Sequence, residues 1–512
     1  MALFESTLIL MLVAILLLQI SRRLAIPYPT ILAAAGVIVA ALPWAPDISI
    51  DPQLALALFI APALLDAAYD FPPRALRRFW MPLIALAAMA VVVTTAAVAW
   101  FAVAWAGLPL AAAIALGAIV SPPDAAAATA MLSRFPLPRS TVTVLKGESL
   151  LNDAVALLIF SAAVASVATG GSHSALLPQL ALAVPGGLVL GIVFGKVYVV
   201  LAARLTGTLG GTMFEFVSTF GVWIIAERLH LSAILCVVTF AMTIARYNPE
   251  RQPALDRLHS YSVWETTVFV LNVLAFLLLG LQARAILAQL DSSEIWHALG
   301  FAGAVFLIVV VVRIVWVMLY NRVINRFGKN RRLPPPTLAQ GIVVSWCGMR
   351  GLVTLATALA LPMSFPGRGL IVLSALAVVL GTLVVQGLTL GPLIRWLRFP
   401  ADASFDEELS STRIALLDAA LASLQGYDNK AADFLRKHHQ AERAMAADGG
   451  EANTVFEGHR MRRVSLAAQR SKLFDLRRSG QIEDDVFHVL ENELDRAELA
   501  VSSSSESGLV EG

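Results

Sequence analysis

A hydroxyl, an amide and a carboxylate lie within five residues of one another in a segment apolar enough to cross a bilayer. They are Ser149, Asn152 and Asp153, in the run Lys-Gly-Glu-Ser-Leu-Leu-Asn-Asp at 146–153. Ser149 and Asp153 are four residues apart, so they share one face of a helix, with Asn152 beside them. An ionised carboxylate inside a membrane is costly unless it faces partners or a water-filled cavity. Because desolvation disfavours its charged form, Asp153 is suited to bind and release a proton or a cation.

Two further acidic residues are candidates for the same site. Asp124 follows Ser-Pro-Pro at 121–123, and adjacent prolines open backbone hydrogen bonds inside a helix. Asp124 can cap the half-helix that follows or contact an ion directly, and the sequence leaves both roles open. Asp66 closes an apolar run and is a further ligand candidate, whereas Asp70 lies nearer the basic residues 74–78 and is expected at the interface.

Other charged residues in apolar segments have structural interpretations. Glu148 and Arg350 are predicted to form a buried ion pair that holds their two segments together. Four more are expected near a membrane interface, where long side chains reach the headgroups: Lys196, Glu215, Glu265 and Arg313.

The composition places these residues in a membrane protein. Of 512 residues, 58% are hydrophobic and 14% are charged, whereas soluble domains average about 25% charged residues. We find no phosphate-binding loop, no His/Cys spacing typical of a metal site and no nucleophile elbow. The chain is therefore not expected to be an enzyme, and no nucleic-acid partner is expected.

Apolar runs separated by short breaks predict thirteen transmembrane helices, each long enough for the hydrocarbon core. Two of them are interrupted, the fifth by Pro122 and Pro123 and the twelfth by two glycines that flank Arg350. They are seven apart in order, which predicts inverted repeats with paired broken helices, the usual place of a transporter's midplane site. The thirteen ranges are 7–21, 28–45, 52–70, 80–105, 108–132, 146–168, 177–203, 211–227, 231–246, 261–281, 296–321, 337–361 and 368–396.

The distribution of charge predicts the orientation and the domains. Lys and Arg concentrate in every second loop along the chain, which predicts an N-terminus outside the cell and a C-terminal tail in the cytoplasm. The membrane is expected to be a bacterial inner membrane. Residues 1–400 hold 25 Lys/Arg against 15 Asp/Glu, whereas residues 401–512 hold 13 against 21. This reversal predicts a transmembrane domain over 1–398, a mainly helical regulatory tail over 399–501 and a disordered terminus over 502–512.

Four motifs, in order along the chain, resemble one family. The run Lys-Gly-Glu-Ser-Leu-Leu-Asn-Asp-Ala at 146–154 is similar to the Glu-Gly-Glu-Ser-Leu-Phe/Leu-Asn-Asp-Ala signature of monovalent cation:proton antiporters. The branch resembled is the NhaP-like one of sodium/proton exchangers. Ser-Pro-Pro-Asp-Ala at 121–125, Ala-Pro-Ala-Leu-Leu-Asp at 61–66 and Gly-Met-Arg-Gly at 348–351 resemble its other motifs. The resemblance covers about residues 1–398.

The resemblance implies an architecture and a binding site. Members are homodimers in which each protomer has a dimerisation bundle and a six-helix core bundle with two broken, crossing helices. By analogy, Asp153 is the ion- and proton-binding carboxylate, and Ser149 and Asp66 are further ligands of the transported Na⁺. The same analogy implies a pair between Glu148 and Arg350.

Three details of the motifs bear on that site. The order Asn152-Asp153 is that of electroneutral members, since electrogenic relatives usually carry two Asp residues there. Pro123 stands where many members have Thr, so any contact at this position would use the backbone carbonyl of Pro123. Asp66 stands where many prokaryotic members have Glu, and its shorter side chain is expected to alter coordination.

The sequence therefore predicts an all-α antiporter that exchanges Na⁺, or Li⁺ or K⁺, for H⁺ at one carboxylate site, without a cofactor, in pH and cation homeostasis. Its expected partners are the cation, the proton, the lipid bilayer and a second copy of the chain. The sequence does not distinguish a nucleotide, a lipid or a second subunit as the ligand of the tail. Two alternatives stand beside this prediction. A cation channel gated by the tail is disfavoured by the single short acidic site, and a sensor derived from a transporter by the intact Asn152-Asp153 pair.

Overall fold

The computed structural model describes most of the chain, in two compact units. Described are all residues except 1, 25, 41–50, 72, 125–134, 136, 169–175, 248–251, 288–294, 328–335, 400–403, 448–452, 480, 482–483 and 502–512. One unit comprises residues 1–401 and the other residues 402–511. The second part of the fifth predicted span and the predicted disordered terminus thus lie outside the described residues.

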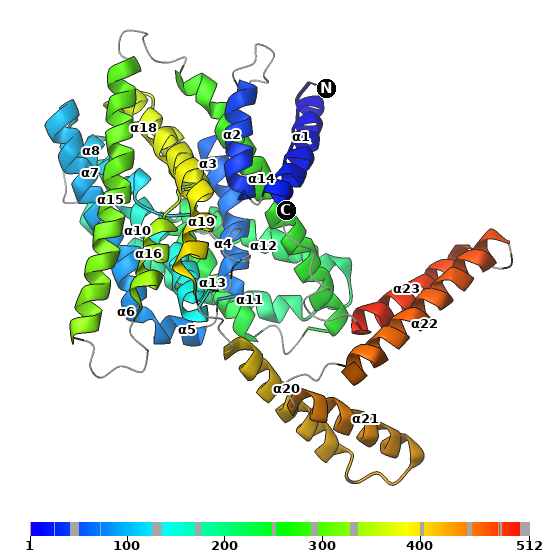
Figure 1. The fold of residues 1–512 in the computed structure, drawn as a ribbon. Coiled ribbons are helices and arrows are strands. Elements are labelled where there is room, and N and C mark those ends of the chain that lie inside the picture. The colour runs from blue at the N-terminus through cyan, green and yellow to red at the C-terminus, as the bar shows by residue number, and fades with distance from the viewer. Residues whose placement is uncertain are drawn as a thin grey trace. The chain divides into compact units, whose positions relative to one another are not determined.

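The first unit is helical throughout its regular structure, and the prediction of an all-α protein is confirmed. Backbone groups in a bilayer must be satisfied within their own segment, which favours helices wherever the sequence is continuously apolar. Each of the predicted ranges overlaps one or more of the observed helices (Figure 1). These are α1 (Ala2–Leu24), α2 (Tyr28–Ala40), α3 (Pro52–Ala55), η1 (Leu56–Ile60), α4 (Ala61–Tyr69), α5 (Pro73–Arg78), α6 (Trp80–Leu83), η2 (Ile84–Met89), α7 (Ala90–Ala106), α8 (Leu110–Val120), α10 (Arg139–Ala168), α11 (Leu176–Ala202), α12 (Leu209–Arg228), α13 (Ala233–Tyr247), α14 (Ala254–Leu287), α15 (Ile295–Phe327), α16 (Leu338–Trp346), α17 (Leu352–Leu359), α18 (Arg368–Gly381), η3 (Thr382–Gln386) and α19 (Gly387–Leu397).

The outer surface of this unit is apolar, as a bilayer requires. On α15, five side chains recur every four residues and are between 46% and 60% exposed: Leu307, Val311, Val315, Leu319 and Val323. Exposure of so long an apolar stripe to water would cost free energy, whereas contact with lipid tails carries no such cost. Six helical stretches of the described residues are long and apolar enough to cross a membrane: Trp80–Ala106, Arg139–Val167, Leu182–Ala202, Ala254–Ala283, Trp296–Arg326 and Arg368–Leu397.

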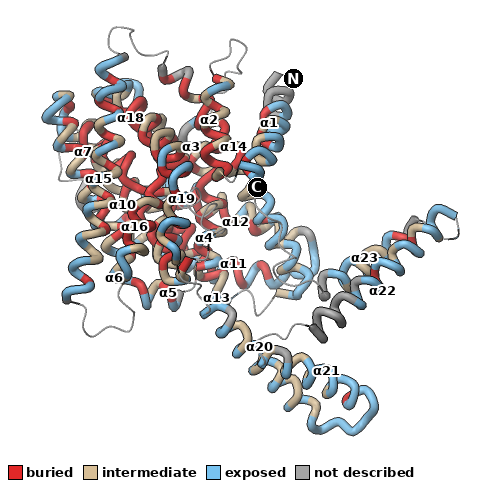
Figure 2. The backbone as a smooth tube through the Cα atoms, in the orientation of Figure 1, coloured by how far each residue is buried: buried red, intermediate tan, exposed pale blue. Residues whose placement is uncertain are grey.

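Buried residues, red in Figure 2, concentrate in the interior of this unit. Their apolar side chains form two clusters, and α10 belongs to both. Leu145 and Ala163 of α10 pack in the first cluster, with side chains of α2, α8 and α14. Leu150 and Ala154 pack in the second, with side chains of α4, α12 and α13. The helix that carries the polar triplet therefore lies where the two clusters meet.

A close contact between α2 and α14 depends on two glycines. A Cβ atom on Gly36 of α2 would lie 2.8 Å from the Cα of Gly280 on α14, and a Cβ on Gly280 would meet the backbone of α2 in the same way. Small residues let membrane helices approach this closely, which increases their dispersion contacts.

The two interrupted segments meet at their interruptions. Helix α8 ends at Val120, and α16 and α17 are separated by residues 347–351. The backbone N–H of Asp124 donates a hydrogen bond to the carbonyl of Met349 at 2.7 Å. This bond satisfies backbone groups that the broken helices leave without an intrahelical partner.

The second unit consists of two helical hairpins where it is described. The first pairs α20 (Ser404–Ser423) with α21 (Lys430–Ala447), and the second pairs α22 (Asn453–Arg478) with α23 (Asp484–Val501). Exposed ion pairs join the partners in each, such as Arg443 with Asp418 at 2.5 Å and Arg470 with Asp495 at 2.6 Å. Exposed pairs of this kind stabilise a fold by about 0–1 kcal/mol each, so apolar contacts such as that of buried Phe487 with Phe474 contribute at least as much.

Candidate functional site

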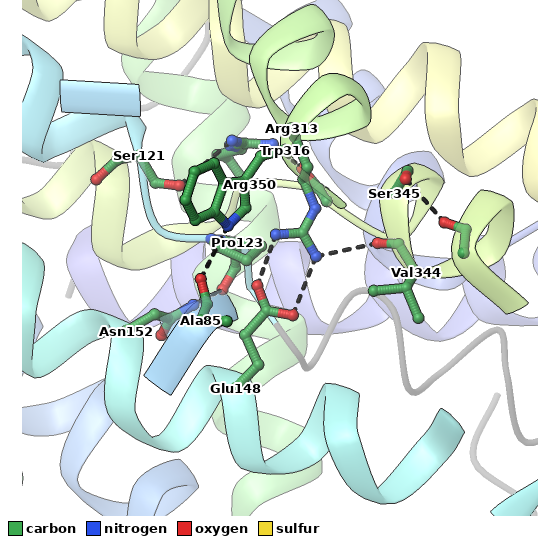
Figure 3. Close-up of polar contacts among 12 residues, drawn as sticks. Ala85, Ser121, Pro123, Glu148, Asn152, Arg313, Trp316, Val344, Ser345 and Arg350 are labelled. Carbon is green, nitrogen blue, oxygen red and sulfur yellow. Dashed lines mark hydrogen bonds and ion pairs between the residues drawn. The ribbon is translucent and has the colours of Figure 1, made fainter. Parts of the chain in front are cut away.

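The centre of the candidate site is the contact between α10 and the first interruption. The amide Nδ2 of Asn152, which is fully buried, donates a hydrogen bond to the carbonyl oxygen of Pro123 at 2.9 Å (Figure 3). Helix α8 ends at Val120, so the carbonyl of Pro123 lies outside it, and here a side-chain amide satisfies that carbonyl. The sequence predicted that any contact at position 123 would use the backbone carbonyl, and the structure has that contact.

Asp153 lies next to this contact and is 6% exposed. It is close enough to Asp124 for the two carboxylates to repel each other. Two like charges in a desolvated place cannot both stay ionised without a proton or a cation between them or near them. The pair is therefore chemically suited to exchange one for the other.

The other two predicted ligands lie on helices that pack together. Ser149 is on α10, one turn before Asp153, and Asp66 is on α4, which contacts α10. Both side chains are half-buried and each takes part in a polar or electrostatic interaction. Whether they bind a cation together with Asp153 stays a prediction.

Arg350 has a different partner from the predicted one. Its buried guanidinium donates through Nε to the carbonyl of Val120 at 3.1 Å and through a terminal nitrogen to the carbonyl of Ser121 at 3.3 Å, and it also bonds the carbonyl of Gly348. Val120 and Ser121 are the last residues of α8, whose final carbonyls lack intrahelical partners. A cation is favoured at a helix C-terminus, so Arg350 caps α8 from the second interrupted segment.

Glu148 pairs with Arg313 of α15, which corrects the predicted pair with Arg350 (Figure 3). The guanidinium of Arg313 donates two bonds to the carboxylate, at 2.6 and 3.1 Å, and a third to the carbonyl of Val344 at 3.0 Å. Both side chains are at least 97% buried, and a bidentate arrangement gives strong attraction in a low-dielectric place. Val344 lies near the C-terminal end of α16, so an arginine is bound at that helix end too.

The sequence left two roles open for Asp124, capping of a helix end and direct contact with an ion. Its position supports the first role, and the second stays a prediction. Its carboxylate lies beside Gly351, where an added Cβ would overlap it. Gly351 is the N-cap residue of α17, and helix N-termini favour negative charge. Asp124 therefore compensates the helix end of the other interrupted segment, and its proximity to Asp153 keeps direct ion contact possible.

Two buried charges were missed by sequence reasoning, which expected them near an interface. Arg313 lies near the middle of α15, and that distance from both helix ends was the signal that it could not reach the headgroups. Glu215 of α12 is 6% exposed and accepts a hydrogen bond from the Ser260 hydroxyl of α14 at 2.6 Å. Lys196 and Glu265, by contrast, are exposed as expected.

Comparison with known proteins assigns the arrangement to a family. The profile of the family described as "Sodium/hydrogen exchanger, transmembrane" matches residues 8–396. The chain belongs to the sodium/hydrogen exchanger family. Membership makes it a secondary transporter and not an enzyme, in line with the prediction from its motifs.

Relatives of this exchanger match nearly the whole chain. An uncharacterized Na(+)/H(+) exchanger of Mycobacterium tuberculosis is 31% identical over 507 residues, which cover 94% of this chain and 93% of that protein. A sodium, potassium, lithium and rubidium/H(+) antiporter of Bacillus pumilus is 27% identical over 94% of this chain and 75% of its own length.

A solved structure supports the fold of the exchanger. The sodium proton antiporter MjNhaP1 from Methanocaldococcus jannaschii at pH 8 matches with a TM-score of 0.59 and 17% sequence identity. The match covers 78% of this chain and 99% of that one. At this identity the likeness concerns the fold alone.

Proposed function

We propose that this exchanger carries Na⁺ in one direction and H⁺ in the other through competition for Asp153. The observation that supports the proposal best is the buried Asp153 beside the hydrogen bond from Asn152 to Pro123, at the point where an interrupted segment meets α10. Carboxylate, hydroxyl and freed carbonyl oxygens are what a small hard cation prefers, and interrupted helices supply them at membrane depth. Ser149 and Asp66 complete the proposed ligand set.

The stoichiometry follows from the chemistry of the triplet. Asn152 is neutral and its amide is engaged by Pro123, so Asp153 is the group of the triplet that can change charge. One carboxylate binds either one Na⁺ or one proton, which makes the exchange electroneutral. The two substrates compete, so the Na⁺ concentration at half-maximal rate is expected to rise as the pH falls.

The proposed architecture places this site in the middle of the membrane. It has thirteen spans in two inverted repeats, with the broken helices crossing at the contact between Asp124 and Met349. The positions of Lys and Arg support an N-terminus outside and a cytoplasmic tail that regulates transport. A homodimer in a bacterial inner membrane follows from the family resemblance. Li⁺ and K⁺ are proposed as further substrates, since the Bacillus pumilus relative is named for several alkali cations.

The test is cation-dependent dissipation of a pH gradient in everted membrane vesicles, followed with a pH-sensitive dye. Asp153→Asn keeps the shape of the side chain and removes its titration, so we expect exchange with Na⁺, Li⁺ and K⁺ to be lost at normal protein abundance. Glu265→Gln, which neutralises an exposed carboxylate of α14, is the matched control and should retain exchange. Exchange by the Asp153→Asn protein would refute the proposal, whereas voltage-driven conductance without a pH gradient would favour a channel.

A further inference from the structure

A cavity of about 710 Å³ extends from Ala154, the residue after Asp153, toward one end of the helices. Ala154, Leu157, Ser161 and Ala165 line it from one face of α10. At 1.5 Å per residue this face extends for about 16 Å, from the residue after Asp153 to the last turn of the helix. The cavity therefore begins beside the carboxylate that is proposed to bind the ion.

The rest of the lining comes from helix ends on the same side of the site. It is contributed by the last two turns of α12, by residues 230–232 and the first turn of α13, and by Gln53, Leu56 and Ala183. In the proposed orientation these ends face the outside of the cell, opposite to the loops rich in arginine. The cavity is then the external approach to Asp153.

Glu227 is the carboxylate among the described residues that line this cavity. It lies in the last turn of α12, where an acidic residue is disfavoured by the negative end of the helix dipole. The position of Glu227 therefore does not stabilise α12. The Glu227 carboxylate and the negative end of the helix dipole both attract a cation. Arg228 and, when it is protonated, His230 also line the cavity and oppose this attraction.

Trp223 gives a second, independent indication of a site here. Its side chain is 2% exposed and lines the cavity, yet its indole N–H makes no hydrogen bond to any described residue. Glu227 lies one turn further along α12 and close enough to interact with that N–H. A buried indole N–H without a hydrogen bond costs free energy, and the Glu227 carboxylate is an acceptor within reach of it.

We propose that Glu227 captures the monovalent cation at the mouth of this cavity and that Trp223 positions its carboxylate. The inference rests on the proposed function, because the captured ion is the one that moves on to Asp153. Capture raises the local cation concentration on one face of the membrane and leaves the chemistry at Asp153 unchanged.

The test measures ²²Na⁺ exchange from each membrane face separately, in right-side-out and everted vesicles. For Glu227→Gln we expect the Na⁺ concentration at half-maximal rate to rise about three- to tenfold on the cavity face, with an unchanged maximal rate and no change on the other face. Glu227→Asp should restore most of the wild-type value. Trp223→Phe removes the indole N–H together with part of the aromatic ring system, and should raise the Na⁺ concentration at half-maximal rate on the cavity face by a smaller factor.

Two controls separate capture from a structural effect. Raising the concentration of choline chloride should reduce the difference between wild type and Glu227→Gln, because ions screen a surface field. Asp51→Asn removes another carboxylate at the same end, one that caps α3 through the N–H groups of Gln53 and Leu54 and does not line the cavity, and should change neither face. The inference would be overturned if Glu227→Gln changed the Na⁺ concentration at half-maximal rate equally on both membrane faces, or on neither face. Absence of exchange by the wild type would instead refute the proposed function.

Discussion

Buried charge in this exchanger is balanced by helix ends as well as by opposite side chains. Arg350 binds the terminal carbonyls of α8, Arg313 binds a carbonyl of α16, and Asp124 lies at the N-terminus of α17. Each helix end near the site thus has a counter-charge from a different segment. In the proposed mechanism, the Asp153 carboxylate is then the group whose charge changes during transport.

At the residue scale we predict strong energetic coupling between Glu148 and Arg313. Glu148→Gln leaves a buried arginine without its carboxylate and should destabilise the protein by about 3–5 kcal/mol. The double variant Glu148→Gln/Arg313→Gln should recover part of that loss, because no unpaired charge remains. The measurement is thermal unfolding of the detergent-purified single and double variants. Additive losses, or coupling of Glu148 to Arg350 in their place, would contradict the pair seen here.

At the element scale, the glycine contact between α2 and α14 determines how closely two long helices approach. Gly280→Leu would force the backbones apart, and we expect a loss of about 3 kcal/mol or more together with poor yield of folded protein. Gly300→Leu is the control, because a side chain at Gly300 of α15 meets no atom within 4 Å. Yields and unfolding temperatures of the two variants test this. Similar values for both would show that the contact is not needed.

The helices were predictable from the sequence because apolar run length and helix length are set by the same membrane thickness. The contact of Asn152 with position 123 was predictable only in part: without a hydroxyl at Pro123 any contact had to use its backbone carbonyl, but the sequence did not identify Asn152 as the donor. The partner of Glu148 was not, because both Arg350 and Arg313 lie in apolar segments of the sequence and only packing places Arg313 against the carboxylate. The π-helical turns η1, η2 and η3 were not predicted either, since they depend on tertiary contacts and not on local preference.

At the scale of the whole molecule, the chain divides into a transport unit and a tail, each with its own contacts. All candidate site residues lie before residue 402, and the helices of the tail pair within their own hairpins. We therefore predict that a chain ending at Ala401 still exchanges Na⁺ for H⁺ in everted vesicles, with a changed response to pH or to a tail ligand. Loss of exchange in a truncated protein that is present at normal abundance in the membrane would show that the tail is part of the machinery.

The hydrogen bond between Asp124 and Met349 joins opposite halves of the polypeptide, and it therefore bears on how the protein is made. Until the ribosome has delivered α16 and α17, the carbonyls at the end of α8 have no arginine and the N–H of Asp124 has no acceptor. Such groups cannot face hydrocarbon, so the nascent first half must be shielded by water or by the insertion machinery. We therefore expect these polar groups of the first half to be satisfied within the protein only after the second interrupted segment has been synthesised.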